Sequence, residues 1–219
     1  RGLSVSVDYF DIDYRNKVTN ALTAQDILNY FPERVTRDPV TGLILQMDSR
    51  AVNLSSASAR GVDVRLAHHL QTRTHGAFNT RLNYTYNIRN KQQSAPDSAV
   101  IENVDASYFP RVRTSAYLFW TYGGFELGPT LTYESSTRNQ LAAGAVAPVR
   151  IRHAIVADLQ GSYDFDASAT TTDWTEGLKI TLGVDNLFDR LPSATDGDGG
   201  YAKIDPRQRR YYLSLRKHF

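Results

Sequence analysis

Two stretches near the end of the chain decide its fold: Leu178-Lys-Ile-Thr-Leu-Gly-Val-Asp-Asn-Leu-Phe-Asp-Arg-Leu-Pro192 and Arg207-Gln-Arg-Arg-Tyr-Tyr-Leu-Ser-Leu-Arg-Lys-His-Phe219. In the second stretch apolar and polar side chains alternate, and the apolar set is Tyr211, Leu213, Leu215 and Phe219. A period of two predicts a β-strand whose two faces meet different surroundings. A fraying soluble terminus seldom needs a large aromatic as its last residue. We therefore interpret the final segment as a strand that closes a membrane barrel.

The composition permits such a barrel although the chain is not strongly hydrophobic. The 219 residues are 41% hydrophobic and have a mean hydropathy of -0.42. No run of about 18 apolar residues exists, so the sequence offers no transmembrane helix. Only alternate residues of a transmembrane β-strand face lipid, which keeps the mean hydropathy of a barrel low. The 13 Tyr and 9 Phe residues suit strands and membrane interfaces.

Charge and cysteine content exclude several classes of protein. The chain has no cysteine, so it has neither a disulfide framework nor a thiolate metal site. A net charge of +2 with both signs interspersed gives no support for nucleic-acid binding. Residues 1–10 alternate like a strand instead of forming a secretion signal. We expect the chain to start at a cut inside a larger protein or at a mature boundary.

Alternation recurs along the whole chain. It predicts strands over residues 3–15, 43–70, 78–89, 112–122, 125–133, 151–165, 178–184 and 207–219. In the first strand the apolar positions change phase at Tyr9-Phe10, which predicts a β-bulge. The second is expected to be irregular over residues 55–59 and regular from Gly61. The region 16–42 is predicted to be a long polar loop.

The predicted connections alternate in length. Long loops follow the first, third, fifth and seventh strands, whereas short turns follow the second, fourth and sixth. Outer-membrane barrels have this asymmetry, with long external loops and short periplasmic turns. A soluble sandwich or barrel also alternates, because it buries one face of each strand and solvates the other. The pattern favours an all-β antiparallel transmembrane β-barrel over a soluble β-protein and over helical folds.

Short motifs give this barrel a family resemblance. Val184-Asp-Asn-Leu-Phe-Asp189, one loop and one strand before a terminal Phe219, resembles the C-terminal signature of TonB-dependent outer-membrane receptors. Asn53 followed by Gly61-Val62-Asp63 resembles a second pattern of that family, and Arg37-Asp-Pro-Val-Thr-Gly-Leu-Ile44 resembles a turn of its large proteobacterial members. Lys217 departs from the family, which usually has an apolar residue two positions before the end. The resemblance covers residues 1–219 as about eight strands of a larger, roughly 22-stranded barrel.

The resemblance implies a location, a function and partners. It implies an active transporter of the bacterial cell outer membrane that imports a scarce substrate, such as a siderophore, cobalamin or an oligosaccharide, with energy coupled through TonB. The implied partners are outer-membrane lipid, the N-terminal plug and remaining strands of a parent chain, the TonB system and the barrel-assembly machinery. Nothing in residues 1–219 resembles the plug domain or the TonB box. No enzymatic activity, cofactor or nucleic-acid partner is implied.

Two groups of residues are singled out by these patterns. Asn186, Leu187, Phe188 and Asp189, with Tyr211, Leu213, Leu215 and Phe219, are predicted to end a strand, form the rim and mark the barrel for assembly. The predicted substrate-binding residues are aromatics in otherwise polar loops, able to stack on a sugar or a siderophore ring: Tyr30, Phe31, Tyr108, Phe109 and Tyr201. The alternative role for these five aromatics is interface anchoring or loop packing.

Metal and catalytic sites find no support in the sequence. The stretch Thr195-Asp-Gly-Asp-Gly-Gly200 lacks the third acidic position and the bidentate Glu of a calcium loop. The histidines form no ligand cluster, and no nucleophile elbow or paired catalytic residues occur. Lumen-facing arginines are expected to pair with nearby carboxylates and with the plug: Arg65, Arg81, Arg113 and Arg152 with Asp63, Glu126 and Asp158. The alternatives to a receptor are a self-contained eight-stranded channel or structural barrel and a soluble sandwich that binds carbohydrate or protein.

Overall fold

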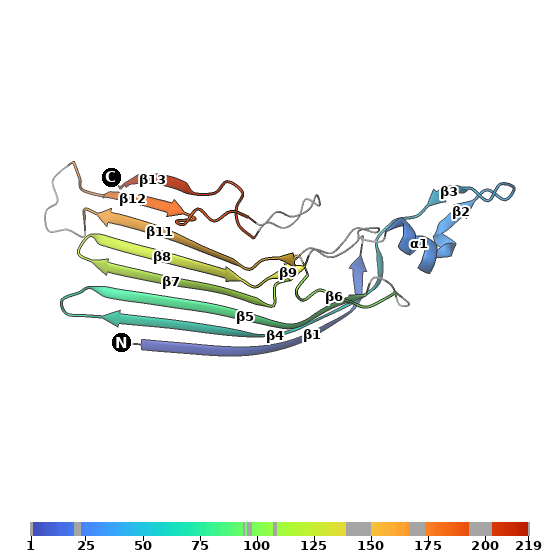
Figure 1. Cartoon of the computed structure of the whole chain (residues 1–219), viewed down its shortest axis with the longest axis horizontal. Helices are drawn as coiled ribbons and strands as arrows, with labels where there is room; N and C mark the ends of the chain where they lie inside the picture. Colours follow the sequence, from blue (N-terminus) through green and yellow to red (C-terminus); the bar gives the residue numbers. More distant parts are fainter. Residues whose placement is uncertain are drawn as a thin grey trace. The chain divides into compact units, whose positions relative to one another are not determined.

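The structure, a computed structural model, describes residues 2–19, 23–93, 95, 98–106, 109–138, 150–166, 174–192 and 203–218. Eight long strands dominate it (Figure 1): β1 (Gly2–Thr19), β4 (Val52–Gln71), β5 (Ala77–Gln93), β7 (Val112–Tyr122), β8 (Phe125–Glu134), β11 (Ala154–Asp164), β12 (Leu178–Asp185) and β13 (Arg210–Lys217). Their order in the hydrogen-bonded sheet is their order in the chain. From β5 to β13 every neighbouring pair is antiparallel. The prediction of an all-β antiparallel fold is confirmed.

The register separates an apolar face from a polar one. Leu82, Ala116, Leu131 and Ala157 are successive partners across four strands, and so are Leu127, Gly161, Leu182 and Leu213. The other face carries rows such as Glu126, Ser162, Thr181 and Ser214. Leu182 and Leu213 are each 61% exposed, so no second sheet within the described residues covers this part of the apolar face. A soluble sandwich buries that face, and the alternative of a sandwich is therefore wrong.

Aromatic side chains gather on the apolar face at the end where the short turns lie. The rings of Phe125 and Tyr163 are 4.5 Å apart between centroids, and those of Tyr163 and Phe165 are 4.8 Å apart. The indole N–H of Trp120 donates to the carbonyl oxygen of His75 at 2.7 Å. Such a band is typical of the aromatic girdle of a membrane barrel.

Pro129 interrupts one ladder of the sheet. Between β7 and β8 the register pairs Arg113–Tyr117 with Thr130–Glu134 and then resumes at Trp120 opposite Leu127. The gap falls at Gly128-Pro129, where proline has no N–H to donate. On its other side β8 remains paired with β11 through this position. The cost of a proline in the strand is thus confined to one edge.

The connections alternate in length as predicted. The short ones are residues 72–76 and Gly123-Gly124, and a longer turn, 165–177, joins β11 to β12. The long ones are residues 20–51, 94–111, 135–153 and 186–209. We call the end of the strands that carries them the long-loop end. No helix among the described residues is long and apolar enough to cross a membrane.

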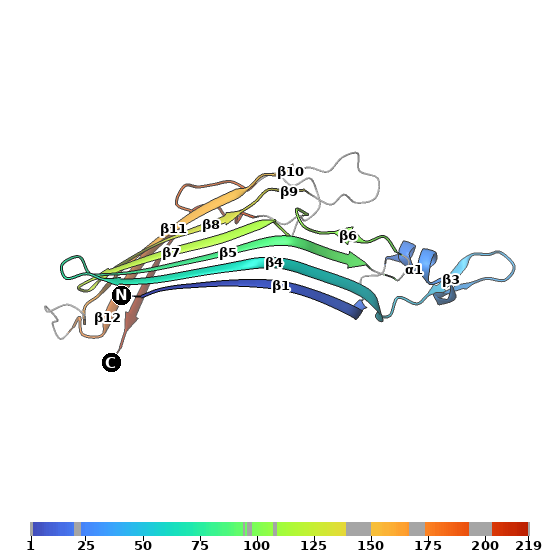
Figure 2. The ribbon, with the colours of Figure 1, turned by 90° about the horizontal axis from the view of Figure 1, so that it is seen from below.

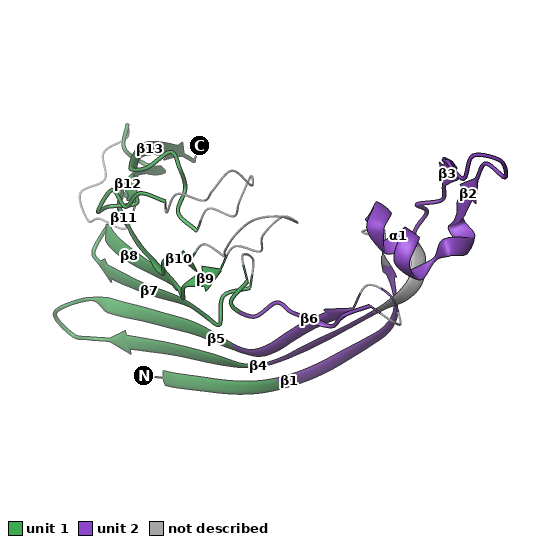
Figure 3. Cartoon of the chain, turned by 45° about the vertical axis from the view of Figure 1, so that its right-hand side comes forward, with its two compact units in different colours: residues 1–9, 62–86, 105–219 green, residues 10–61, 87–104 purple. Residues whose placement is uncertain are grey.

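The chain divides into two compact units (Figure 3). Unit 1 comprises Arg1–Tyr9, Val62–Tyr86 and Asp105–Phe219, and unit 2 comprises Phe10–Gly61 and Asn87–Val104. Strands β1, β4 and β5 each contribute residues to both units. They are neighbours in the sheet and run side by side in Figure 2. Strand β1 is continuous across the predicted phase change at Tyr9-Phe10, and the bulge stays a prediction.

Unit 2 contains structure that the sequence patterns did not predict. The expected loop 16–42 holds the end of β1, helix α1 (Ala24–Tyr30), the 3-10 turn η1 (Pro32–Arg34) and strand β2 (Val35–Arg37). Strand β3 (Ile44–Met47) pairs with β2 instead of beginning the second long strand. Residues 55–59, expected to be irregular, lie inside β4. A short strand β6 (Ile101–Glu102) pairs with the end of β5.

Helix α1 lies on a small apolar core. Ile27, Phe31 and Ala95 are buried together, and Tyr30, Val35 and Met47 pack around them. The hydroxyl of Thr23 accepts from the backbone N–H of Asp26, and the Asp26 carboxylate accepts from the backbone N–H of Thr23. This reciprocal capping box satisfies donors at the helix N-terminus and explains where the helix begins.

Unit 1 also differs in detail from the prediction. The strand expected over residues 151–165 is divided, because β10 (Arg150–Ile151) pairs with β9 (Thr137–Arg138) and β11 starts only at Ala154. Arg152 and His153 lie between the two pieces, outside any strand. This break places Arg152 and His153 at the long-loop end of β11.

Candidate functional site

The polar face of unit 1 is a wall of cross-strand polar contacts. The hydroxyl of Thr85 donates to Asp63 at 2.6 Å, and the amide of Asn83 donates to Ser115 at 3.2 Å. Further along the wall Arg210 lies 2.8 Å from Asp185. These contacts join neighbouring strands on the face away from the apolar surface. They give the wall a hydrophilic lining.

Among the described residues, the carboxylates expected to pair with the lumen-facing arginines contact other groups, and pairing of these arginines with a plug stays a prediction. The carboxylate of Asp63 accepts from Thr85, Glu126 lies 4.0 Å from Lys179, and Asp158 accepts the backbone N–H of Asn186 at 2.7 Å. Arg113 pairs instead with Glu134 at 2.8 Å. Which charges meet depends on the register of each strand pair, which alternation alone does not specify.

Two aromatic rings lie on the polar wall over glycines. A Cβ on Gly128 would lie 2.5 Å from a ring carbon of Phe119, and one on Gly183 would lie 2.1 Å from the Cζ of Tyr212. The phenol of Tyr212 also donates to the amide oxygen of Gln160 at 3.1 Å. Each ring occupies the space that a side chain would need on the adjacent strand.

Charged side chains converge at the long-loop end of β7 and β8. The guanidinium of Arg111 donates to Asp105 at 2.8 Å, close to the pair formed by Arg113 and the buried Glu134. The ammonium of Lys203, which comes from the segment before β13, donates to the carbonyl oxygen of Ser135. Burial lowers the pKa of Lys203, against the opposing attraction of Glu134 and Asp105.

A cavity of about 500 Å3 opens in this charged region. Its lining includes Asp105, Arg111, Arg138 and Arg150, together with Thr137. Thr137 is almost fully buried, and its hydroxyl has no hydrogen-bond partner among the described residues. A polar cavity with several guanidinium groups suits a polar, negatively charged ligand.

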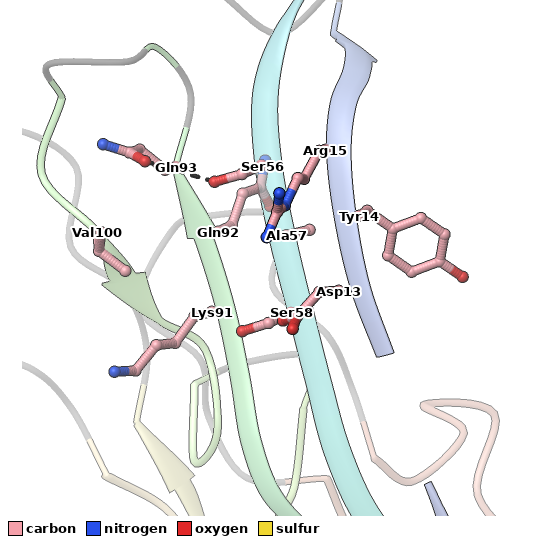
Figure 4. Close-up of a pocket in the computed structure, with 10 residues that line it drawn as sticks. All are labelled: Asp13, Tyr14, Arg15, Ser56, Ala57, Ser58, Lys91, Gln92, Gln93 and Val100. Carbon is pink, nitrogen blue, oxygen red and sulfur yellow. Dashed lines mark hydrogen bonds between the residues drawn. The ribbon is translucent and has the colours of Figure 1, made fainter. Parts of the chain in front are cut away.

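Unit 2 has a smaller polar pocket of about 270 Å3 on strands β1, β4 and β5 (Figure 4). Asp13 and Arg15 come from β1, Ser56 and Ser58 from β4, and Lys91 from β5. Figure 4 shows the Tyr14 ring pointing away from its neighbours Asp13 and Arg15, as alternation on a strand requires. Hydroxyl, carboxylate, guanidinium and ammonium groups in one pocket offer both donors and acceptors to a polar ligand.

A charged cluster lies on the same strands of unit 2. The Asp11 carboxylate is 2.5 Å from Arg60 and 3.8 Å from Arg89. One carboxylate therefore contacts two guanidinium groups on these strands. The polar pocket and the Asp11 cluster together make the polar surface of unit 2 suited to a ligand with charged or hydrogen-bonding groups.

The predicted loop aromatics do not gather at one site. Phe31 is only 6% exposed in the core of unit 2, where the Arg34 guanidinium lies 5.8 Å from its ring, and Tyr30 packs beside it. This burial favours the alternative role, loop packing, for Phe31. Phe109 is 40% exposed in a turn of unit 1 closed by its hydrogen bonds with Asp105 and Ala106. Tyr108 and Tyr201 lie outside the described residues, and stacking on a substrate stays a prediction.

The Asn186-Leu-Phe-Asp189 motif forms a tight turn after β12. Asn186 has a φ of 55° and is buried, and its side chain exchanges two hydrogen bonds of 2.8 Å with the backbone of Arg190. Asp189 also has a positive φ, and its carboxylate accepts the backbone N–H of Arg209 at 3.0 Å. Asn and Asp tolerate this left-handed conformation better than most residues, which explains their positions.

The apolar members of the C-terminal signature lie on the apolar face. Leu187 and Phe188 line an apolar groove with Leu131, and Phe188 is 68% exposed. Tyr211, Leu213 and Leu215 alternate along β13, and all three are exposed. Phe219 lies outside the described residues. A role of these residues in barrel assembly stays a prediction.

Sequence reasoning missed the charged cluster of Arg111, Asp105, Arg113 and Glu134, because its members come from separate segments. It also missed the turn near β13 in which Arg207 holds the pKa of Asp205 at about 2. The signal for that turn was local, an acidic residue two positions before an arginine. Among the described residues, no group of three histidine, aspartate or glutamate side chains is arranged to hold a metal ion.

Comparison with known proteins gives one family and a set of similar solved structures. The family model described as TonB dependent receptor-like, beta-barrel matches residues 1–187. No curated protein matches the chain. The solved structures include a mutant of the ferric enterobactin receptor of Pseudomonas aeruginosa, which is 18% identical with a TM-score of 0.62 over 100% of this chain and 29% of that one.

Two further structures show the same fold at low identity. The ferripyoverdine receptor of the outer membrane of Pseudomonas aeruginosa is 15% identical, with a TM-score of 0.60 over 98% of this chain and 25% of that one. The outer membrane transporter YddB from Escherichia coli is 10% identical, with a TM-score of 0.64 over 100% of this chain and 31% of that one. The chain thus spans less than a third of the length of these proteins.

Proposed function

The chain belongs to the TonB-dependent receptor β-barrel family, and from this we propose that it forms part of the wall of an active transporter. Its place is the bacterial outer membrane, where this family resides. The observation that carries the proposal is the family match over residues 1–187, on a sheet with one apolar and one polar face. The apolar face would contact lipid, and the polar face would line the lumen.

In this proposal the chain does not itself couple energy to transport. The wall supplies a hydrophilic lining and long loops, while a plug and the TonB system, as partners from outside residues 1–219, would capture and release the ligand. Barrel-assembly machinery and lipid are proposed partners for insertion. We propose no catalytic role and no cofactor.

A ferric siderophore is the first candidate substrate, and cobalamin and an oligosaccharide are the alternative candidates. The proteins with similar structures include receptors for ferric enterobactin and ferripyoverdine. The guanidinium-lined cavity beside Asp105 and the mixed polar pocket in unit 2 support a charged, hydrogen-bonding ligand. An apolar ligand would find little complementary surface there.

Uptake by cells tests this proposal. Cells that carry the full-length receptor containing this chain, and matched cells without it, are given an iron-55-loaded siderophore, cobalt-57 cobalamin or a labelled oligosaccharide. We expect receptor-dependent uptake of one substrate, and loss of that uptake when a protonophore removes the proton gradient. Receptor-dependent uptake that survives the protonophore would identify a passive channel and contradict the proposal.

The alternative of a self-contained eight-stranded barrel has no support in the strand order. Strands β1 and β13 stand at opposite ends of the hydrogen-bonded order, and in the described part of the chain no backbone pairing joins them. A closed barrel requires that pairing. The open order favours a segment that needs further strands.

A further inference from the structure

The polar pocket of unit 2 is built on one face of three neighbouring strands (Figure 4). Strands β1, β4 and β5 are adjacent in the sheet, and side chains two residues apart on a strand share a face. The lining accordingly includes one such pair from each strand: Asp13 and Arg15 from β1, Ser56 and Ser58 from β4, and Lys91 and Gln93 from β5. These pairs bring charges from both outer strands to one pocket.

Short side chains on the central strand leave the space that the pocket occupies. The part of the lining that comes from β4 is Ser56, Ala57 and Ser58. In Figure 4 Ser58 lies between Lys91 of β5 and Asp13 of β1. The pocket has a volume of about 270 Å3. Sites that enclose a whole drug-sized ligand measure roughly 300–1,000 Å3, so this pocket suits one group of a larger ligand.

The charged side chains of the pocket have no partner of opposite sign. Among the described residues, Asp13, Arg15 and Lys91 form no ion pair and no side-chain hydrogen bond. The nearby carboxylate of Asp11 contacts two other guanidinium groups. Charge-assisted hydrogen bonds are roughly twice as strong as neutral ones, so each of the three groups gains from a ligand atom of opposite charge.

The signs of these charges restrict the ligand. A purely anionic group would be attracted by Arg15 and Lys91 but repelled by Asp13, and a purely cationic group would meet the reverse. A neutral group would leave all three charges unpaired. A group that carries one charge of each sign satisfies both sides of the pocket.

The spacing of the strands gives the separation of the two charges in the ligand. Residues two apart on a strand are separated by about 6.6 Å, which applies to Asp13 and Arg15. Lys91 is two strands away from them, about 9.6 Å between backbones at about 4.8 Å per strand. The two ends of an extended dipeptide are about 7 Å apart. A short peptide therefore places its ammonium and its carboxylate at a suitable distance.

We propose that this pocket binds a zwitterionic, peptide-like group of the transported ligand. Asp13 accepts from the ammonium of that group, and Arg15 and Lys91 donate to its carboxylate. The pocket lies at the ends of β1, β4 and β5 that lead into the long connections 20–51 and 94–111, which are external in an outer-membrane barrel. The source of the ligand rests on the proposed transport function, whereas the binding chemistry does not.

The first test measures binding to purified full-length receptor in detergent, where neither TonB nor a proton gradient acts. The probes are alanyl-alanine, N-acetyl-alanyl-alanine without the ammonium, and alanyl-alanine amide without the carboxylate. Titration followed by saturation-transfer NMR gives a dissociation constant for each. We expect alanyl-alanine to bind at least tenfold more tightly than either blocked form. Equal binding of the three probes, or no binding of alanyl-alanine, would overturn the proposal.

The second test assigns the two charges of the ligand to residues. Asp13→Asn should weaken binding of alanyl-alanine about tenfold and leave the N-acetyl form unchanged or tighter, because it removes a repulsive carboxylate. Lys91→Gln should weaken binding of alanyl-alanine and leave the amide form unchanged or tighter. A merely structural role would weaken all three probes together, and that result in both variants would overturn the proposal.

Glu33→Gln is the matched control for these variants. It removes a carboxylate of the same unit from the exposed turn η1, outside the pocket. All three dissociation constants should stay unchanged, and heat-modifiable mobility on gels verifies that each variant is folded. An effect of Glu33→Gln as large as that of Asp13→Asn would show that the pocket does not select the ammonium, and would overturn the proposal.

Uptake by cells connects the pocket to the transported ligand. At a low concentration of the transported substrate, uptake should fall about tenfold in Asp13→Asn and stay unchanged in Glu33→Gln. Unchanged uptake in Asp13→Asn would overturn the assignment to the transported ligand. Energy-dependent uptake without binding of alanyl-alanine would leave the transport proposal standing and this one overturned. Passive uptake with the expected binding preference would do the reverse for the zwitterion site.

Discussion

Gly183 illustrates how single residues shape the polar wall, because the ring of Tyr212 occupies the space beside its Cα. We predict that Gly183→Ala forces this ring to move and breaks its hydrogen bond to Gln160, which lowers the free energy of unfolding by about 1–2 kcal/mol. In a Tyr212→Ala background the same substitution should cost little. The measurement is urea unfolding of the full-length receptor in detergent, followed as a double-mutant cycle.

Gly161→Ala is the matched control for this prediction. It lies on the neighbouring strand β11, and an added Cβ would come no closer than 3.8 Å to another atom. Its effect on the free energy of unfolding should be within about 0.5 kcal/mol. Equal losses for Gly183→Ala with and without the Tyr212 ring would show that the ring is not the cause.

At the scale of residues, the sequence predicted conformations better than contacts. The motif at Asn186 was predicted to end a strand and start a turn, and the positive φ of Asn186 and Asp189 agrees with that prediction. The partners of Asp63, Glu126 and Asp158 were predicted wrongly. An Asn at a left-handed position is a local requirement, whereas a cross-strand ion pair depends on the register of two strands.

At the scale of elements, the stability of helix α1 depends on its N-terminal capping box. We predict that Thr23→Ala removes the capping box and lowers the local stability of Ala24–Tyr30 by about 1 kcal/mol. Hydrogen exchange of the α1 amides should accelerate about fivefold, while exchange in β12 stays unchanged. Gln25→Ala serves as the control, because Gln25 is exposed and its bond to Asn29 lies outside the cap.

The outcome for Gln25→Ala decides what the cap contributes. Alanine is a better helix former than glutamine, so this control should leave exchange in α1 unchanged or slower. Acceleration of the same size in both variants would show that α1 is sensitive to any substitution, and that the Thr23 cap has no special part in its stability.

Long elements were predicted more reliably than short ones. Each long strand carries its own alternation, so β5, β7 and β8 follow almost directly from the sequence. Helix α1 was missed inside a predicted loop, although Thr23 and Asp26 have capping-box spacing. Seven residues contain too few helical turns for a periodic signal, and the core residue Ala95 comes from a distant segment.

At the scale of the whole molecule, the order of the strands in the sheet was predictable, whereas the sheet itself is left open at β1 and β13. Short turns and alternating loops predict that consecutive strands are neighbours, and the order from β1 to β13 agrees. Neither alternation nor turn length states how many strands complete a barrel, because neither depends on that number. The polar pockets were likewise unpredictable, because each one draws on several strands and loops.

The open order leads to a prediction about the chain on its own. Each of β1 and β13 has one edge without a backbone partner in the described residues, and the apolar face between them is exposed. Unpaired edges beside apolar surface are templates for self-association. Residues 1–219 expressed alone should therefore aggregate without detergent and elute from size-exclusion chromatography as large, polydisperse species.

The full-length receptor, whose further strands would pair both edges, should elute in detergent as a single sharp species under the same conditions. A monodisperse, folded monomer of residues 1–219 in detergent-free buffer would contradict both the lipid-facing assignment of Leu182 and Leu213 and the need for further strands.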